Sequence, residues 1–122
     1  EERGPVLISF WALWCVPCTK ELPHLQKIHR EYGPRGLTLV GINEDDPSSE
    51  AKVRPFLRAG QYTFPVAVDK DKTLWRRFKV VSMPSVFLID REGNVVYTHT
   101  GYRPGDEARL REAVARLFPD EN

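Results

Sequence analysis

The fold is decided by residues 6–18, which read Val6-Leu-Ile-Ser-Phe-Trp-Ala-Leu-Trp-Cys-Val-Pro-Cys18. The run from Val6 to Trp11 is almost entirely apolar and rich in β-forming residues, as is typical of a strand that is covered on both faces. After Cys15, apolar residues recur at helical spacing until Gly33-Pro34 ends the pattern, and Pro23 should kink this helix. A C-x-x-C between a buried strand and a helix indicates a redox motif.

The rest of the chain alternates predicted strands and helices. A second buried strand is expected at residues 37–42, and strand, helix and strand with short connections imply a right-handed parallel unit. The later pattern predicts, in order, a helix from Asp46-Pro47 to Gly60, a strand at 64–68, a helix capped by Asp71, an antiparallel hairpin of 86–89 and 95–98, and a helix at 106–118. The sequence therefore predicts the α/β class.

Composition bounds the size and the partners of the protein. The chain has 122 residues, 41% of them hydrophobic, which predicts a single domain over residues 1–122 that can fold without covalent staples. Lys and Arg number 18 against 17 Asp and Glu, and the net charge of +1 argues against nucleic acid or an acidic membrane as the main partner. Apolar runs such as 86–89 are far shorter than the ~20 residues that cross a bilayer, which predicts a soluble chain.

The two cysteines are thus free for chemistry. Three residues are about one helical turn, so both sulfurs can meet at a helix N-terminus, where unpaired N–H groups and the helix dipole favour a thiolate. We expect the pKa of Cys15 to fall below the free value of about 8.5, while Cys18 stays protonated until it resolves a mixed disulfide. Pro17 removes one backbone donor between them and limits flexibility.

A metal site is the competing interpretation of the same cysteines. Zinc could use them with His24 and His29, but only five residues separate Cys18 from His24, where zinc-finger patterns have about a dozen. Copper with His99 has no better support, since nothing ties that residue to the motif. We therefore expect no metal, and we expect the three histidines to be ordinary polar surface residues.

The segment 70–79 carries five basic residues together with Trp75 and Phe78, a composition that could suggest nucleic-acid or membrane contact. Leu74, Trp75 and Phe78 form one apolar edge at helical spacing, which turns most of the charges outward. A solvated basic face is the favoured interpretation.

Two separate motifs resemble the thioredoxin superfamily: residues 10–18 match its active-site signature, and Met83-Pro84 before a strand matches its cis-proline site. Within it, the segments at 18–23, 39–43, 64–66 and 83–90 resemble the TlpA-like, or ResA-like, thiol-disulfide oxidoreductases, so the likeness covers nearly the whole chain. The resemblance implies a thioredoxin fold, with a central mixed β-sheet flanked by helices and a helix-strand insert around residues 47–69. The family usually has extra strands before Val6, so N-terminal strands and a signal or membrane anchor are expected to be missing from a chain that starts at Glu1.

The resemblance also implies a mechanism. Cys15 would attack a substrate protein disulfide and Cys18 would release the product, with no metal or organic cofactor. An active-site rim for substrate docking is expected from Trp14, Val16, Pro17, Met83 and Pro84, the last after a cis peptide bond. Implied partners are disulfide or dithiol proteins and an upstream electron donor, and the protein is expected to be a monomer.

The expected role is that of a reductant in the bacterial periplasm or cell envelope, serving cytochrome c maturation. An envelope oxidase or isomerase, or a non-catalytic metal carrier that uses the same thiols, is the alternative. Thioredoxins proper have a buried Asp and a Lys where this chain has Ser9 and Gly41, so another base must deprotonate Cys18. Glu44, in the acidic segment 44–46, is the candidate proton acceptor, and a solvated acidic turn is the alternative there.

Overall fold

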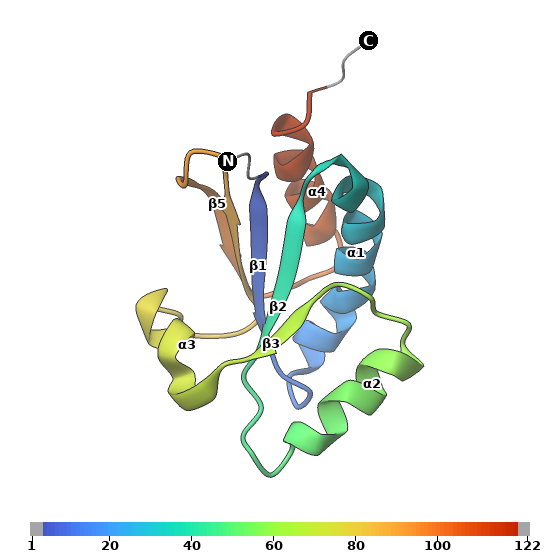
Figure 1. Cartoon of the computed structure of the whole chain (residues 1–122), viewed down its shortest axis with the longest axis vertical. Helices are drawn as coiled ribbons and strands as arrows, with labels where there is room; N and C mark the ends of the chain where they lie inside the picture. The colour runs from blue at the N-terminus through green and yellow to red at the C-terminus, as the bar shows by residue number, and fades with distance from the viewer. Residues whose placement is uncertain (1–3, 120–122) are drawn as a thin grey trace.

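β1 (Val6–Trp11) is the central strand of a five-stranded sheet, as its unbroken apolar run predicts. The computed structural model describes residues 4–119, and Figure 1 shows helices on both faces of the sheet. The other helices and strands are α1 (Val16–Tyr32), β2 (Thr38–Asn43), α2 (Val53–Ala59), β3 (Val66–Val68), α3 (Thr73–Arg77), β4 (Ser85–Ile89), β5 (Val95–Thr100) and α4 (Asp106–Arg116).

The strands lie in the order β3-β2-β1-β4-β5. β1, β2 and β3 run parallel, whereas β4 pairs antiparallel with both β1 and β5. The sheet is therefore mixed, and the predicted hairpin forms its last two strands. At the carboxyl edge of the parallel strands, Trp11 lies opposite Asn43 and Asn43 lies opposite Val68. The segments that follow β1 and β2 consequently leave the sheet at the same end.

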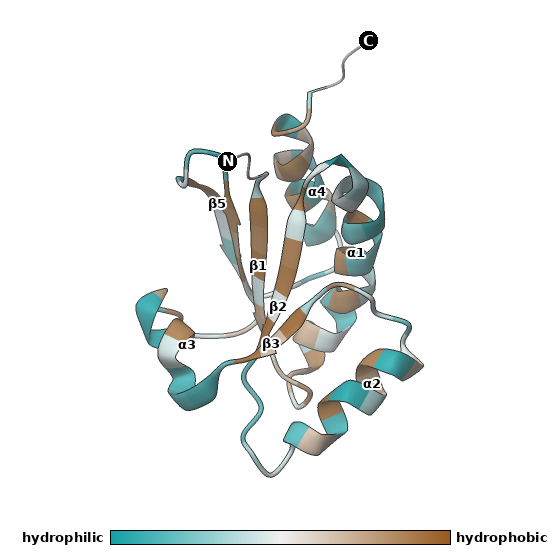
Figure 2. Ribbon diagram, viewed as in Figure 1, coloured by the Kyte–Doolittle hydropathy of each residue, from teal (hydrophilic) through white to brown (hydrophobic). Residues whose placement is uncertain are grey.

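Alternate residues of β1 supply two separate cores, because successive strand side chains point to opposite faces. Leu7 and Trp11 belong to the larger cluster, which α1 and α4 cover. Ile8 and Phe10 lie on the other face, in the smaller cluster that α3 covers. Figure 2 shows the hydrophobic residues concentrated on the strands, with hydrophilic residues along the outer sides of the helices.

α2 and β3 form the expected insert between residues 47 and 69, but the helix begins later than predicted. A turn at 47–49 and a 3-10 turn at 50–52 precede α2. Asp46 caps that turn, since its Oδ1 accepts a hydrogen bond from the N–H of Ser49 at 3.3 Å. Pro55 lies in the first turn of α2, where its missing N–H removes no helical hydrogen bond. In α1, Pro23 lies inside the helix, which continues past it to Tyr32.

The prediction that Asp71 caps α3 is wrong, because Asp69 does so. The two carboxylate oxygens of Asp69 accept hydrogen bonds from the N–H groups of Leu74 and Trp75, both at 2.9 Å. Asp71 itself has a left-handed backbone with φ of 59°, and Lys72 follows in the same region with φ of 54°. This turn, in which the N–H of Lys72 donates to the carbonyl of Asp69 at 3.1 Å, separates Asp71 from the start of α3 at Thr73. Among residues 4–119, no helix is long and apolar enough to cross a membrane.

Candidate active site

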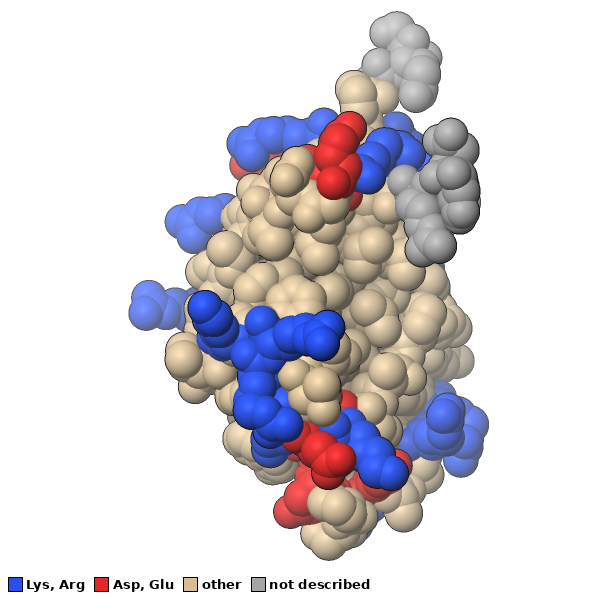
Figure 3. All heavy atoms as spheres, turned by 60° about the vertical axis from the view of Figure 1, so that its left-hand side comes forward, with Lys and Arg blue, Asp and Glu red and all other residues tan. Residues whose placement is uncertain are grey.

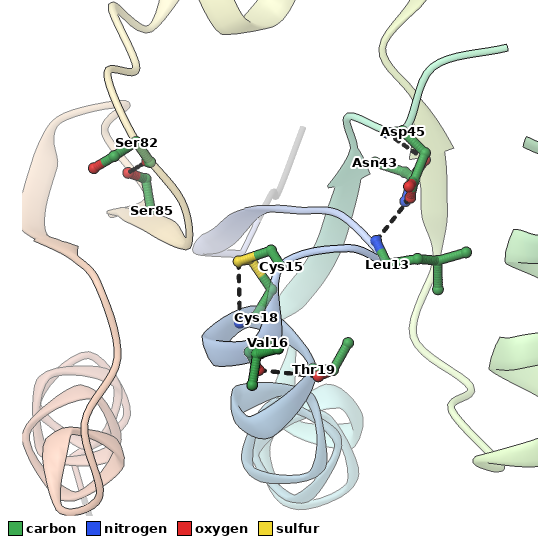
Figure 4. Close-up of a disulfide and its surroundings, with 9 residues drawn as sticks. All are labelled: Leu13, Cys15, Val16, Cys18, Thr19, Asn43, Asp45, Ser82 and Ser85. Carbon is green, nitrogen blue, oxygen red and sulfur yellow. Dashed lines mark hydrogen bonds between the residues drawn. A yellow bond between two sulfur atoms is a disulfide. The ribbon is translucent and has the colours of Figure 1, made fainter. Parts of the chain in front are cut away.

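The two cysteines form a disulfide at the N-terminus of α1 (Figure 4). Cys15 is the N-cap residue, and its Sγ accepts a hydrogen bond from the backbone N–H of Cys18 at 3.3 Å. Cys18 is fully buried and Cys15 is 6% exposed, so the sulfur nearer to solvent is the one that receives the helix N–H group. An N–H donor directed at Sγ would stabilise a thiolate there more than a thiol.

The turn that leads into Cys15 is tied to the end of β2. The backbone N–H of Leu13 donates to Oδ2 of Asp45 at 2.8 Å, as Figure 4 shows, and the N–H of Glu44 donates to the carbonyl of Trp11 at 2.8 Å. Asn43 supports the arrangement by donating its side-chain amide to the same Asp45 oxygen at 2.8 Å. These bonds fix the loop whose last residue is the N-cap cysteine.

The predicted rim residues differ in how far they face solvent. Trp14 and Val16 are 67% and 60% exposed, and Pro17 is also exposed. Met83 is half-buried and packs against the cluster that includes Cys15 and Cys18, while Pro84 is buried. The structure therefore packs Met83 against the core cluster that holds both cysteines, and exposed apolar residues precede and follow Cys15 in the chain.

The segment that carries Met83 is held in place at both ends. The Met83–Pro84 peptide bond is cis. Ser85 donates its hydroxyl to the carbonyl of Ser82 at 2.7 Å, and the N–H of Gly101 donates to the carbonyl of Pro84 at 2.7 Å. Figure 4 shows Ser82 and Ser85 on the loop that faces the disulfide. This loop also exposes Val81 by 85%, a residue that the sequence analysis did not single out.

Glu44 is buried rather than part of a solvated turn. Its side chain is 1% exposed, and Oε1 accepts a hydrogen bond from Nζ of Lys72 at 3.3 Å. Among the residues that the structure describes, Oε2 has no hydrogen-bond partner. Burial, together with the neighbouring Asp69 carboxylate, raises the pKa of Glu44 to about 8. A carboxyl group with this pKa can exchange a proton near neutral pH, but its charged partner is Lys72 rather than a cysteine.

A second buried carboxyl, Glu21, was missed by the sequence analysis. It lies three residues after Cys18 in α1 and is only 4% exposed, with no hydrogen-bond partner for Oε1 among residues 4–119. Burial, reinforced by the charge of Asp106, raises its pKa to about 8. Residues i and i+3 are neighbours on a helix surface, so Glu21 is one turn from Cys18. The burial of Glu21 could have been predicted from its position, because it is an acidic residue on the helix face that also carries Leu22 and Leu25.

Ser9 and Gly41, the positions where thioredoxins have charged residues, lie opposite each other in the sheet. Ser9 is fully buried, and its hydroxyl has no partner within the described part of the chain. A Cβ atom on Gly41 would come within 3.0 Å of Nε1 of Trp11 and 3.2 Å of Phe64. The space that a lysine would need at residue 41 is therefore filled by two aromatic rings.

The histidines, which the sequence predicts to be ordinary polar surface residues, are partly exposed. Each ring has its own neighbour: His24 stacks on Tyr102, His29 packs edge-on against Phe64, and His99 bonds to Asp106 at 3.1 Å. None of these contacts involves Cys15 or Cys18. Residues 4–119 contain no group of three His, Cys, Asp or Glu side chains that could hold a metal ion.

Comparison with known proteins assigns the chain to a family. The model of the AhpC/TSA family matches residues 1–98. The chain belongs to this family. It is 33% identical to the thiol-disulfide oxidoreductase ResA of Bacillus subtilis over 116 residues, which are 95% of this chain and 63% of the relative. ResA of Bacillus thuringiensis is 29% identical over 114 residues, 93% of this chain and 64% of the relative.

Two solved structures of similar proteins confirm the thioredoxin fold. One is described as a thiol:disulfide interchange protein DsbE from Chlorobium tepidum, with a TM-score of 0.87 and 32% identity over 95% of this chain and 81% of that chain. The other is StoA from Bacillus subtilis, with a TM-score of 0.78 and 26% identity over 93% of this chain and 84% of that chain. The expected resemblance to ResA-like thiol-disulfide oxidoreductases is thus confirmed. The chain nevertheless spans less than two-thirds of the length of the ResA relatives.

Proposed function

We propose that this protein is a protein thiol-disulfide oxidoreductase whose redox group is the Cys15–Cys18 pair itself. The observation that carries the proposal is the position of this pair at the start of α1, with the Cys18 N–H directed at Sγ of Cys15. The similar proteins ResA, a thiol-disulfide oxidoreductase, and DsbE, a thiol:disulfide interchange protein, support the same chemistry. No metal or organic cofactor is needed, because the two sulfurs carry the two electrons.

In the reduced protein, the Cys15 thiolate attacks one sulfur of a substrate disulfide. A mixed disulfide forms, and the second substrate sulfur leaves and takes up a proton. Cys18 then loses its proton and attacks Sγ of Cys15, which expels the first substrate sulfur as a thiolate. The products are a substrate dithiol and the Cys15–Cys18 disulfide, so two electrons pass from protein to substrate. Because Cys18 is fully buried and Cys15 is slightly exposed, the geometry supports Cys15 as the attacking sulfur.

The resolving step needs a group that accepts the Cys18 proton. Glu21 and Glu44 are the two candidates, since both are buried carboxyls with a pKa of about 8. Position favours Glu21, which is one helical turn from Cys18, whereas Glu44 bonds to Lys72. We therefore assign the proton acceptor to Glu21 and keep Glu44 as the second candidate, to be separated by their glutamine variants.

Substrate docking uses the exposed apolar rim. Trp14, Val16 and Pro17 lie beside Cys15, and Met83 packs against the same cluster from the loop that ends at Pro84. Exposed backbone in such a loop can pair with an extended substrate segment, and apolar side chains around it bury surface on docking. Val81, on the same loop, extends the rim.

The direction and place of action are also proposals. The ResA-like resemblance supports a reductant in the bacterial envelope or periplasm that takes electrons from an upstream thiol-disulfide donor and serves cytochrome c maturation. A general oxidase or isomerase would use the same site with a different donor. Comparing the redox state of Cys15 and Cys18 in cells by alkylation separates them, because a reductant is held as the dithiol and an oxidase as the disulfide.

Reduction of insulin disulfides tests the central proposal. The wild-type protein should accelerate the reaction with a thiol donor, and Cys15→Ser should remove the acceleration. Thr19→Ala, at a partly exposed position nearby, should leave it intact, because within residues 4–119 that hydroxyl bonds to the carbonyl of Val16 alone. Stoichiometric metal binding without any insulin turnover would contradict the proposal and favour a metal carrier.

A further inference from the structure

A basic surface precedes the Met83 loop in the chain, and of its residues only Lys72 contacts a group described above, Glu44. We call it the α3 basic surface; its residues are Lys70, Lys72, Arg76, Arg77 and Lys79, all exposed. Figure 3 shows basic side chains gathered on the side of the molecule where α3 lies. Within residues 4–119, Lys72 is its one member with a carboxylate within 4.0 Å. Lys70 and Lys72 line a pocket that also contains acidic residues, so the excess positive charge lies mainly on Arg76, Arg77 and Lys79.

The helix that carries the α3 basic surface is anchored to the sheet and to Asp69. Phe10 of the central strand contacts Trp75 and Phe78, with ring centroids 6.4 Å and 5.6 Å apart. Asp69 caps the helix through the N–H groups of Leu74 and Trp75. The apolar edge of α3 is thus buried in the smaller core, and its charges are presented outward in a fixed arrangement. As the sequence predicts, Arg76 and Arg77 face solvent.

This surface also lies within reach of the disulfide rim. Lys79 precedes Met83 by four residues, so their Cα atoms are separated by at most about 14 Å even in an extended chain. Met83 packs against the cluster of Cys15 and Cys18, and Val81 projects from the chain between Lys79 and Met83. An ordinary protein interface covers about 800 Å² on each partner, roughly a disc of 16 Å radius. A partner with an interface of this size centred on Met83 would therefore reach Val81 and Lys79.

We propose that the α3 basic surface selects protein substrates that carry Asp or Glu residues beside the reactive disulfide. The proposal rests on the oxidoreductase function above and adds the substrate class. Cations at the edge of an interface mainly raise the rate of association with an acidic partner, and salt screens this effect over about 8 Å at physiological strength. A nucleic acid has no disulfide to bring to the adjoining rim, so the position of the surface favours an acidic polypeptide.

The test uses single-turnover oxidation of the pre-reduced protein by three cyclic peptides. Each peptide has one internal disulfide, flanked by Asp, Asn or Lys. At about 20 mM salt we expect the bimolecular rate constant to be about tenfold higher for the Asp peptide than for the Lys peptide. At 1 M salt the ratio should shrink to about two. This salt series needs no variant, so it does not depend on the folding of altered proteins.

Charge reversal then locates the effect. R76E/R77E/K79E should make the Lys peptide the faster substrate and leave the Asn peptide within about twofold. The matched control is K27E/R30E/R58E, which changes the net charge equally at exposed positions of α1 and α2 and should keep the wild-type order. Three outcomes would overturn the proposal. The wild type could react equally fast with all peptides, or the control variant could show the same reversal. The first variant could also lose binding to duplex DNA while its peptide rates stay unchanged. Failure of the wild type to react even with the Asn peptide would instead refute the oxidoreductase function.

Discussion

Asp45 accepts a hydrogen bond from the backbone N–H of Leu13 at 2.8 Å, across 32 positions of the chain. The same oxygen accepts the side-chain amide of Asn43, and Asp45 is 8% exposed. The bond thus connects the end of β2 with the turn before Cys15. Within the acidic segment after β2, the Asp45 carboxylate bonds to the active-site loop, the Glu44 carboxylate bonds to Lys72, and Asp46 alone faces solvent.

Asp45→Ala should destabilise the protein by about 1–3 kcal/mol, because the Leu13 N–H and the Asn43 amide lose a buried acceptor. The rate of reaction of Cys15 with a small disulfide should also fall, since the turn before it is freed. Urea denaturation and stopped-flow kinetics measure the two effects. Glu50→Ala removes an exposed carboxylate of the neighbouring segment and should change both by little. Equal effects from the two variants would show that the Leu13 bond does not position the cysteine.

Cys18→Ser should trap the protein as a mixed disulfide with its substrate. The Cys15 thiolate can still attack, but no second thiol remains to release the product. Non-reducing gels of the variant mixed with a disulfide protein should show a covalent adduct that dithiothreitol removes. Cys15→Ser is the matched control and should give no adduct, because Cys18 is fully buried. A stronger adduct with Cys15→Ser would reverse the assigned roles.

Stability should fall as pH rises from about 5 to about 8. The pKa values of Glu21 and Glu44 rise from their ordinary value of 4.5 to about 8, because burial disfavours the carboxylates. The stability held by their protonated forms is therefore fully present below pH 4.5 and is lost as pH passes about 8. Each group accounts for a loss of roughly 3–5 kcal/mol at most.

Glu21→Gln and Glu44→Gln should each flatten this dependence, as urea denaturation at a series of pH values would show. Glu112→Gln, at an exposed position of α4, is the control and should leave the slope unchanged. A readout of function separates the two buried groups: only the proton acceptor should alter the pH profile of the resolving step. If neither glutamine variant changed the slope, the raised pKa values would be incorrect.

Gly41→Ala should cost roughly 1–3 kcal/mol, because the added methyl group would press on the Trp11 and Phe64 rings. Thermal unfolding measures the loss, and the Trp11 fluorescence should change with it. Gly33→Ala is a suitable control, since its new Cβ would meet nothing closer than 3.6 Å and its φ is −55°. An unchanged melting temperature for Gly41→Ala would mean that the rings yield freely.

Local patterns were sufficient for much of the fold. The apolar run at 6–11 predicted the central strand, helical spacing predicted α1 up to Gly33, and the polar turn at 91–94 predicted the hairpin of β4 and β5. Helix starts were less predictable. Asp69 and Asp71 are equally good caps in sequence, and the choice between them depends on a left-handed turn at Asp71 and Lys72 that propensities do not encode.

The redox chemistry that we propose follows from local sequence, because a C-x-x-C between a buried strand and a helix places both sulfurs at one helix N-terminus through local geometry alone. The surroundings of the two sulfurs depend on tertiary packing. Whether Glu21 and Glu44 are buried, which N–H group Asp45 binds, and what fills the space above Gly41 all depend on side chains from distant parts of the chain. Burial and electrostatic environment arise from packing between elements, and no periodicity within one element contains them.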